Sequence, residues 1–198
     1  MSAEALIAEA VRRRDARLHK SPLPSAAKLY APLLHALMTL HEVALSSTAS
    51  PLELVNFSRA VRRTGRRLED IADSERPRPL AAFIASTVEP DIIPLADAVA
   101  ALLGHAHAPG GDPVFADVAE ALAVVVETEL GPALASTCQL PSFELPRPWR
   151  TTFQPQRHQL LERGDGPRDV VVSVERCGRV GVGGRLLDPA LVIVGGAA

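Results

Sequence analysis

Residues 51–71, PLELVNFSRAVRRTGRRLEDI, carry the clearest structural pattern in this chain of 198 residues. The positions of one seam recur at alternating steps of three and four: Leu54, Phe57, Val61, Thr64, Leu68 and Ile71. This spacing predicts a helix roughly 30 Å long, at ~1.5 Å per residue, with one continuous seam that packs on other helices. Ser50 is expected to cap this helix, with Pro51 at its first position and Glu53 completing a capping box.

The same segment carries a stripe of arginines beside the apolar seam. Its members are Arg59, Arg62, Arg63, Arg66 and Arg67, which are neighbours on one face of a helix. One interpretation is a solvated face whose arginines pair with nearby acids such as Glu53, Glu69 and Asp70. The other is a face that docks on an acidic protein surface. Nucleic acid is the less favoured partner, because 21 basic residues are balanced by 23 acidic ones.

Helical patterns continue on both sides of this segment, up to about residue 135, where Ala, Leu, Glu and Arg predominate. Further helices are expected over residues 2–20, 25–45 and 80–103, and from Pro113 onwards, with Asp112 as the cap of the last. Pro90 and Pro94 predict a kink or a break near residue 90. HAHAPGGD at 105–112 is expected to be a loop.

The helical region contains a repeated pattern of a helix, a polar turn and a helix that begins with proline. Pro94 and Pro113 lie 62 positions after Pro32 and Pro51, and apolar positions coincide under the same offset. Either the region arose by duplication, or helices rich in Ala and Leu align with ease. Two such hairpins would form a four-helix bundle, in which every apolar stripe is covered.

The chain changes character at CQLPSFELP, residues 138–146, after which Pro, Gly and Val become frequent. DVVVSV at 169–174 and RLLDPALVIV at 185–194 predict strands, with a hairpin turn at Gly183-Gly184. Pro189 predicts an edge position or a bulge. We therefore expect an α+β protein with a helical tail (1–21), whose apolar positions are too few to hold it alone, a helical bundle (22–140) and a C-terminal all-β domain (141–198).

Composition excludes other classes of protein. Apolar residues make up 47% of the chain, which excludes disorder throughout, and 5 Phe, 1 Tyr and 1 Trp are too few for a base-stacking surface. No apolar run approaches the ~18 residues of a membrane span, and no block of signal-peptide type precedes Arg12. Cys138 and Cys177 form no CxxC pair, which favours a reduced, cytoplasmic protein without disulfides.

Other residue groups have both a chemical and a structural interpretation. His105 and His107, with Asp112 and Cys138, could converge on a metal, but His-x-His in a Gly/Pro loop is typical of a solvated turn. A Cys–His nucleophile pair lacks an orienting partner. Trp149 is expected to anchor the linker between the two parts of the chain. No catalytic residue, metal or cofactor is therefore expected.

Residues 89–194 resemble the GrpE family, the nucleotide exchange factors of DnaK-type chaperones. EPDIIPLADAVAAL (89–102) is similar to the family's bundle helix with a Leu-Pro-x-Leu-Asp core, and residues 113–130 are similar to its next helix. FQPQRHQLL (153–161) is similar to the Phe/Leu-Asp-Pro-x-x-His motif, and GRLLDPALVIV (184–194) is similar to the closing strand. The resemblance implies a bundle that carries a β domain and acts by binding, not as an enzyme.

The chain departs from the family pattern at several positions. The motif aspartate is Gln154, the Gly-aromatic pair of the hairpin is Arg179-Val180, and an arginine is replaced by Asp188. The long N-terminal coiled-coil helix of the family is missing. Family members are dimers in which each chain gives two helices to a shared bundle. Because this chain carries two helical hairpins, both a monomer with its own bundle and a homodimer are open.

The resemblance implies that the protein binds a DnaK-like chaperone ATPase, stabilises its open nucleotide cleft and promotes ADP release. It places the partner contacts on the β domain, where Arg185 is the first candidate, followed by Arg176 and Val194. Arg179 and Asp188 belong to the same candidate surface, and the charge reversal at Asp188 suggests a divergent ATPase. The alternative is an adaptor that uses this fold only to bind a partner, or does so through Arg59, Arg62, Arg63 and Arg66.

Overall fold

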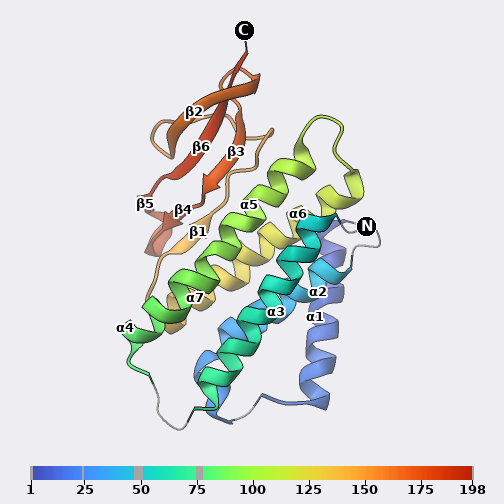
Figure 1. Cartoon of the computed structure of the whole chain (residues 1–198), viewed down its shortest axis with the longest axis vertical. Helices are drawn as coiled ribbons and strands as arrows, with labels where there is room; N and C mark the ends of the chain where they lie inside the picture. The colour runs from blue at the N-terminus through green and yellow to red at the C-terminus, as the bar shows by residue number, and fades with distance from the viewer. Residues whose placement is uncertain (1, 24, 47–50, 75–77, 198) are drawn as a thin grey trace.

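The computed structural model describes residues 2–23, 25–46, 51–74 and 78–197 (Figure 1). The helical elements are α1 (Ala3–Lys20), the 3-10 helix η1 (Ser25–Tyr30), α2 (Ala31–Leu45), α3 (Leu52–Ala72), α4 (Leu80–Phe83), the π-helix η2 (Ile84–Ile92), α5 (Ile93–His107), α6 (Pro113–Val125), the π-helix η3 (Val126–Leu130) and α7 (Gly131–Cys138). The strands are β1 (Ser142–Glu144), β2 (His158–Pro167), β3 (Val171–Arg176), β4 (Gly178–Val180), β5 (Leu186–Asp188) and β6 (Ala190–Ala197). The expected α+β class, with helices before a small β domain, is confirmed.

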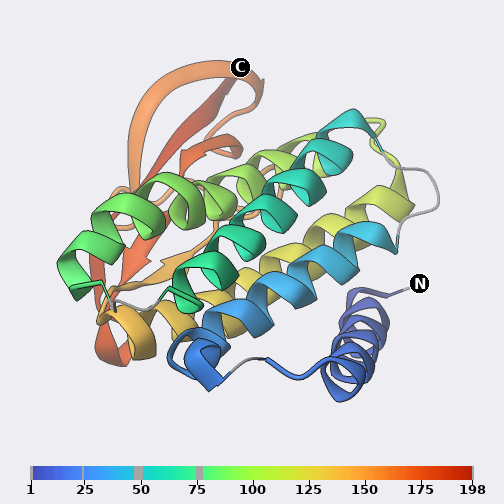
Figure 2. The same ribbon diagram turned by 60° about the horizontal axis from the view of Figure 1, so that its bottom comes forward.

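The bundle is built from two helical hairpins (Figures 1 and 2). α2 packs on α3 and α5 packs on α6, while contacts between α2 and α6 and between α3 and α5 complete a four-helix arrangement. Its core is largely aliphatic and includes the fully buried Leu33, Leu37, Leu40, Leu54, Leu68, Leu103, Leu122 and Leu130. The hairpins expected from the proline spacing are thus neighbours in space, and each apolar stripe is covered by another helix.

Pro90 lies within a helical rod that runs from α4 through η2 into α5. Proline has no N–H to donate and its ring crowds the preceding turn, so residues Ile84–Ile92 adopt the wider π-helical winding. The break considered near residue 90 is wrong, because the helical rod continues through Pro90, and the structure has a change of winding there instead. The loop expected over 105–112 is wrong in part, because α5 continues to His107 and only residues 108–112 connect it to α6.

α1 packs on α2 and α6 and runs at an angle to the bundle helices (Figure 2). Its buried residues are Leu6 and Ala10. Arg14 adds a polar clamp, because its Nη1 donates to Thr39 Oγ1 at 2.9 Å and to Glu129 Oε2 at 3.1 Å. Ile7 also packs partly against the core.

The starts of α3 and α6 bear on the expected helix caps. Asp112 caps α6, since its Oδ1 accepts from Val114 N at 2.8 Å, and Pro113 is the first helical residue as expected. α3 begins at Leu52, so Pro51 precedes the helix instead of opening it. Ser50, the expected cap of α3, lies outside the described residues.

The β domain consists of two three-stranded sheets. One is antiparallel in the order β1-β4-β5, and in the other β6 lies between β2, to which it is parallel, and β3, to which it is antiparallel. The single strand expected over 185–194 is wrong, because Pro189 divides it into β5 and β6 of different sheets. Gly183 and Gly184 lie in a turn at the expected place, with φ of +74° and +78°. The turn is longer than the two residues expected, because residues 181–185 connect β4 to β5 and include the 3-10 helix η4 (Val182–Gly184).

The β domain rests on the bundle through β3, which packs along α5 (Figure 1). Val171, Val174, Val192 and Val194 are buried there. β1 and β2 were not anticipated as strands, and β3 begins two residues later than expected. Within the described ranges, no helix is both long and apolar enough to span a bilayer.

Candidate functional site

The turn between β4 and β5 presents apolar side chains beside an arginine. Val182 is fully exposed and Leu187 is 49% exposed. Gly181 N donates to Arg185 O at 2.8 Å and closes the turn, while the Arg185 side chain is exposed. We call Val182, Arg185 and Leu187 the hairpin tip. An apolar pair next to a solvent-facing guanidinium is the kind of surface that protein partners cover. The sequence argument found Arg185 but missed Val182 and Leu187, although both flank the Gly-Gly turn.

The base of this hairpin is fixed to the bundle. Asp97 of α5 accepts from Cys177 N at 2.8 Å, directly before β4. The guanidinium of Arg179 lies 4.5 Å above the centre of the Phe143 ring on β1. Burial lowers the pKa of Arg179, although Asp97 opposes the shift. Arg179 was expected to contact a partner, but its half-buried side chain packs within the domain.

The other candidates on the β domain separate into exposed and buried residues. Arg176 at the end of β3 and Asp188 at the end of β5 are exposed and available to a partner. Val194 is 0% exposed in the centre of β6, so its expected role as a contact residue is wrong. A central strand buries alternate side chains, and the sequence position alone does not show which face Val194 takes.

The Pro-x-x-His segment forms a tight turn that leads into β2. His158 Nδ1 accepts from Gln154 N at 3.1 Å, and His158 N donates to Gln154 O at 2.8 Å. The Phe153 ring lies 5.9 Å from that of His158. Burial is the main reason that the pKa of His158 is lowered. Because residue 154 uses its backbone for these contacts, the turn forms with Gln154 in place of the family's aspartate.

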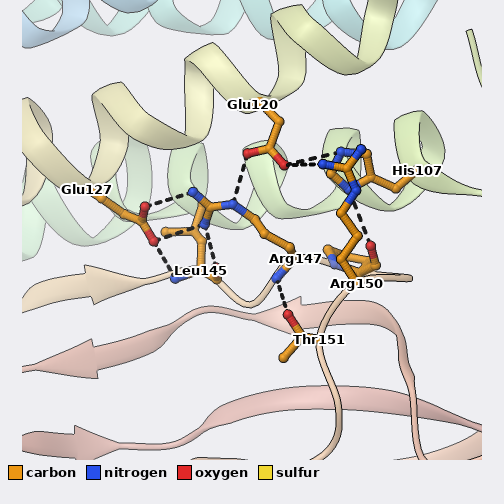
Figure 3. A network of polar contacts seen from close by, with 8 residues as sticks. His107, Glu120, Glu127, Leu145, Arg147, Arg150 and Thr151 are labelled. Carbon is orange, nitrogen blue, oxygen red and sulfur yellow. Dashed lines mark hydrogen bonds and ion pairs between the residues drawn. The ribbon is translucent and has the colours of Figure 1, made fainter. Parts of the chain in front are cut away.

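A second anchor joins the linker after β1 to the bundle (Figure 3). Arg147 donates through Nη2 to Glu127 Oε2 at 2.9 Å and through Nε to Glu120 Oε2 at 3.0 Å. Arg150 Nη1 reaches Glu120 Oε1 at 3.3 Å. The backbone N of Arg147 donates to Thr151 Oγ1 at 2.8 Å, and this hydrogen bond holds the linker in a tight turn. We call Glu120, Glu127, Arg147 and Arg150, together with the adjoining His107, the Arg147 clamp.

Electrostatics favour the charged form of Arg147 inside the clamp. Burial by itself lowers the pKa of this guanidinium, but the hydrogen bonds and charges of Glu127 and Glu120 outweigh it and the pKa is raised. His107 Nδ1 contacts Pro148 O at 3.3 Å, and its Nε2 lies 3.3 Å from Glu120 Oε1 without hydrogen-bond geometry. Burial and, to a smaller extent, Arg150 lower the pKa of His107.

Trp149 lies in the linker between β1 and β2, between Arg147 and Arg150 of the clamp. Its N donates to Val171 O at 2.7 Å, and its ring lies beside Gly166, where an added Cβ would stand 3.2 Å from the ring. Trp149 is therefore an anchor, as expected from its place in the sequence. Sequence analysis missed the clamp and Asp97, because no local pattern joins an arginine in a Pro-rich linker to acids on α6.

The arginine stripe lies exposed along α3 and is mostly unpaired. Arg59, Arg62, Arg63 and Arg66 make no ion pair within the described parts of the chain. Arg67 binds Asp91 Oδ2 at 2.6 Å and Ser86 O at 2.8 Å. The expected pairing of the stripe with Glu53, Glu69 and Asp70 is absent among these residues. Unpaired guanidinium groups remain available for an external anion.

Two adjoining hollows lie along the seam between α2 and α3. One has a volume of about 230 Å³ and is bordered by Met38, His41, Arg62 and Arg66. The other, of about 290 Å³, extends past His41 and Arg62 to Leu45. The two hollows share the lining residues His41 and Arg62, and we call them together the α2–α3 groove. His41 spans its floor through a 3.2 Å contact between Nδ1 and Ser58 Oγ, and burial lowers its pKa.

The residues considered for a metal do not converge. Cys138 is buried at the end of α7, where burial raises the pKa of its thiol. His107 belongs to the clamp, whereas His105 is exposed and Asp112 caps α6. Across the described ranges, no three His, Cys, Asp or Glu side chains are grouped as a metal site requires.

Comparison with known proteins adds no relative. No family model matches the chain, and neither the curated proteins nor the solved structures contain a significant match.

Proposed function

We propose that the protein is a GrpE-like nucleotide exchange factor that binds a DnaK-type chaperone ATPase and promotes ADP release. The hairpin tip is the observation that carries this proposal. It combines exposed apolar side chains and Arg185 on a domain that is fixed to the bundle. The order of bundle helix, Pro-x-x-His turn and closing strand, which the chain shares with that family, supports the same function.

The mechanism needs no bond chemistry by the protein. A binding protein accelerates ADP release when it prefers the open form of the ATPase over the closed, ADP-bound form. A tenfold preference corresponds to about 1.4 kcal/mol, and ADP must weaken binding of the exchange factor by the same factor. The Arg147 clamp and the hydrogen bond from Cys177 N to Asp97 support such a preference, because they hold the hairpin tip in one orientation relative to the bundle.

The bundle supports action as a monomer. All four helices come from one chain, and the seam residues Leu54, Val61 and Leu68 are buried without a second copy. A dimer that exchanges helices would have to expose this core before forming. Light scattering at micromolar concentration is therefore expected to give the mass of one chain, and a dimer mass would contradict this part of the proposal.

The experiment is stopped-flow release of a fluorescent ADP analogue from a DnaK-type ATPase of the same organism. The protein is expected to accelerate release by about tenfold or more. Arg185→Ala and Val182→Asp should each reduce the acceleration by about tenfold, because they remove the cation and the apolar contact of the tip. Arg168→Ala is the matched control, since Arg168 is an exposed arginine of the same domain outside the hairpin.

The results separate an exchange factor from an adaptor and test whether the hairpin tip is the contact. Binding to the ATPase without a change in ADP release would replace the exchange factor by an adaptor. An equal loss for Arg168→Ala and Arg185→Ala would remove the hairpin tip as the contact. No binding in either nucleotide state would overturn the proposal for that ATPase class.

A further inference from the structure

We propose that the α2–α3 groove binds an acidic, amphipathic helical segment of a partner protein. This site lies on the first helical hairpin, away from the β domain, and does not depend on the exchange activity. Its basis is the combination of an apolar floor, an open glycine and unpaired arginines along one border.

The shape of the groove suits a helix. Its apolar floor is formed by Met38, Val55 and Leu45, which are half-buried or exposed along the two helices. Beneath them the core side chains of the bundle are buried. Gly65 leaves the middle of the groove open, because an added Cβ there would meet nothing within 4 Å. From Leu54 to Glu69 the lining of α3 spans roughly 22 Å at ~1.5 Å per residue, the length of about 15 helical residues.

The positive charges along the groove favour an acidic occupant. Arg59, Arg62 and Arg66 line the groove from α3 and have no ion-pair partner among the described residues. On the facing side, Arg17 is already held by the buried Glu42, with Nη1 2.8 Å from Oε1. The border is thus cationic and unsatisfied, and it complements a helix that carries Asp or Glu beside its apolar stripe.

The apolar floor argues for a helix over a nucleic acid or a lipid surface. A phosphate backbone or a membrane would engage every exposed arginine of α3 alike, including Arg63, which lines neither hollow of the groove. A helix seated in the groove would depend on Arg62 and on the space above Gly65. This difference makes the two neighbouring arginines a matched pair, with the same residue type on the same helix.

The probe is a fluorescein-labelled peptide of about 15 residues, with leucines along one helical face and glutamates flanking them. Fluorescence anisotropy is expected to show saturable binding that weakens with added salt. Arg62→Glu should weaken binding by about tenfold, and Arg63→Glu by about twofold or less. Gly65→Leu should abolish binding, because the new side chain fills the groove, while its higher helix propensity leaves the thermal midpoint equal or higher.

The remaining outcomes overturn the proposal. Equal losses for Arg62→Glu and Arg63→Glu would mean unspecific attraction to the arginine stripe. Undiminished binding by Gly65→Leu would place the peptide elsewhere. Binding to single-stranded DNA or to anionic phosphatidylserine vesicles that matches or exceeds peptide binding, with both arginine variants equally impaired, would assign the face to nucleic acid or membrane. A peptide that does not bind at all would exclude this class of occupant.

Discussion

The two helical hairpins share a proline spacing but differ in what covers them. The α5–α6 hairpin carries the β domain, which it binds through Asp97, Glu120 and Glu127. The outer seam of the α2–α3 hairpin remains open as a groove bordered by arginines that have no ion pair among the described residues. The same helical pattern therefore binds the β domain in the α5–α6 hairpin and leaves a surface exposed in the α2–α3 hairpin.

The 62-residue offset between the hairpins shows where they differ. Ser58 and Gly65 of α3 correspond to Glu120 and Glu127, the two carboxylates that accept from Arg147. One acceptor of the clamp, Glu127, thus corresponds to Gly65, which leaves the middle of the α2–α3 groove open. The other, Glu120, corresponds to Ser58, which binds His41 on the floor of the groove.

The surroundings of the two helices explain the rest of the difference. Arg59 and Arg63 correspond to Ala121 and Val125, which are fully buried. α6 is packed by α1, α2 and α5, whereas the face of α3 that carries Arg59 and Arg63 is exposed. An arginine in place of Ala121 would be buried without a partner, so the enclosed helix is restricted to apolar residues.

Truncation of the core should show the strongest contrast between the hairpins. Leu122→Ala in α6 is expected to lower the free energy of unfolding by about 4 kcal/mol, and Leu54→Ala in α3 by about 3 kcal/mol. Both side chains are 0% exposed, but α6 is packed by three long helices, whereas α3 is packed by two long helices and the short η1 and η2. A cavity in α6 is therefore expected to collapse less. Urea unfolding followed by circular dichroism measures both values. A larger loss for Leu54→Ala would contradict the view that α6 is the more enclosed helix.

Removal of one arginine from each half tests the clamp against the free face. Arg147→Ala is expected to destabilise the protein by about 2–3 kcal/mol, since it leaves Glu120 and Glu127 half-buried without their main partner. Arg62→Ala should change the stability by less than about 0.5 kcal/mol. Arg147→Lys is the informative control, because a lysine cannot span both carboxylates and should recover only part of the loss. Thermal unfolding of the parent protein and the three variants measures these differences in stability. Equal losses for the two alanine variants would contradict a stabilising role of the clamp.

Two glycines extend the comparison to the backbone. Gly65→Ala should stabilise the protein by about 0.5–1 kcal/mol, because alanine is the better helix former and the site is open. Gly131→Ala, at the start of α7, should destabilise it by about 1–2 kcal/mol, because its Cβ would collide with Ser142 of β1. Chemical denaturation measures the change in the free energy of unfolding for both variants and therefore its sign. If the two substitutions shifted stability in the same direction, the close approach of β1 to α7 would be refuted.

The smallest expected effect is the dependence of stability on pH. Burial lowers the pKa of His41 in the groove and of His107 in the clamp. Folding therefore favours their neutral forms, and their contribution to stability is complete above the ordinary histidine pKa of about 6.5. It is lost as the pH falls through that value towards the lower pKa of the folded state. Thermal midpoints from about pH 7.5 to about pH 5.5 should decline less for His107→Gln and for His41→Gln than for the parent protein; a steeper decline would contradict the sign.

The local elements follow from the order of residues along the chain. The seam of α3, the Asp112 cap and the Gly183-Gly184 turn depend on residues within a few positions of one another, so their patterns were sufficient to predict them. Pro90 was expected to kink or break the helix, and the structure has a change of winding there instead. The error at Pro189 arose where a distant part of the chain supplies the packing surface.

The sequence by itself thus determined the class of fold, the two helical hairpins and the arginine stripe, because periodicity and turn chemistry act over short distances. Tertiary structure decided which surfaces stay open. Burial of Val194, attachment of Arg147 to Glu120 and Glu127, and the space above Gly65 each depend on segments that meet only after folding. A side chain's exposure is set by what packs against it, and no local pattern carries that information.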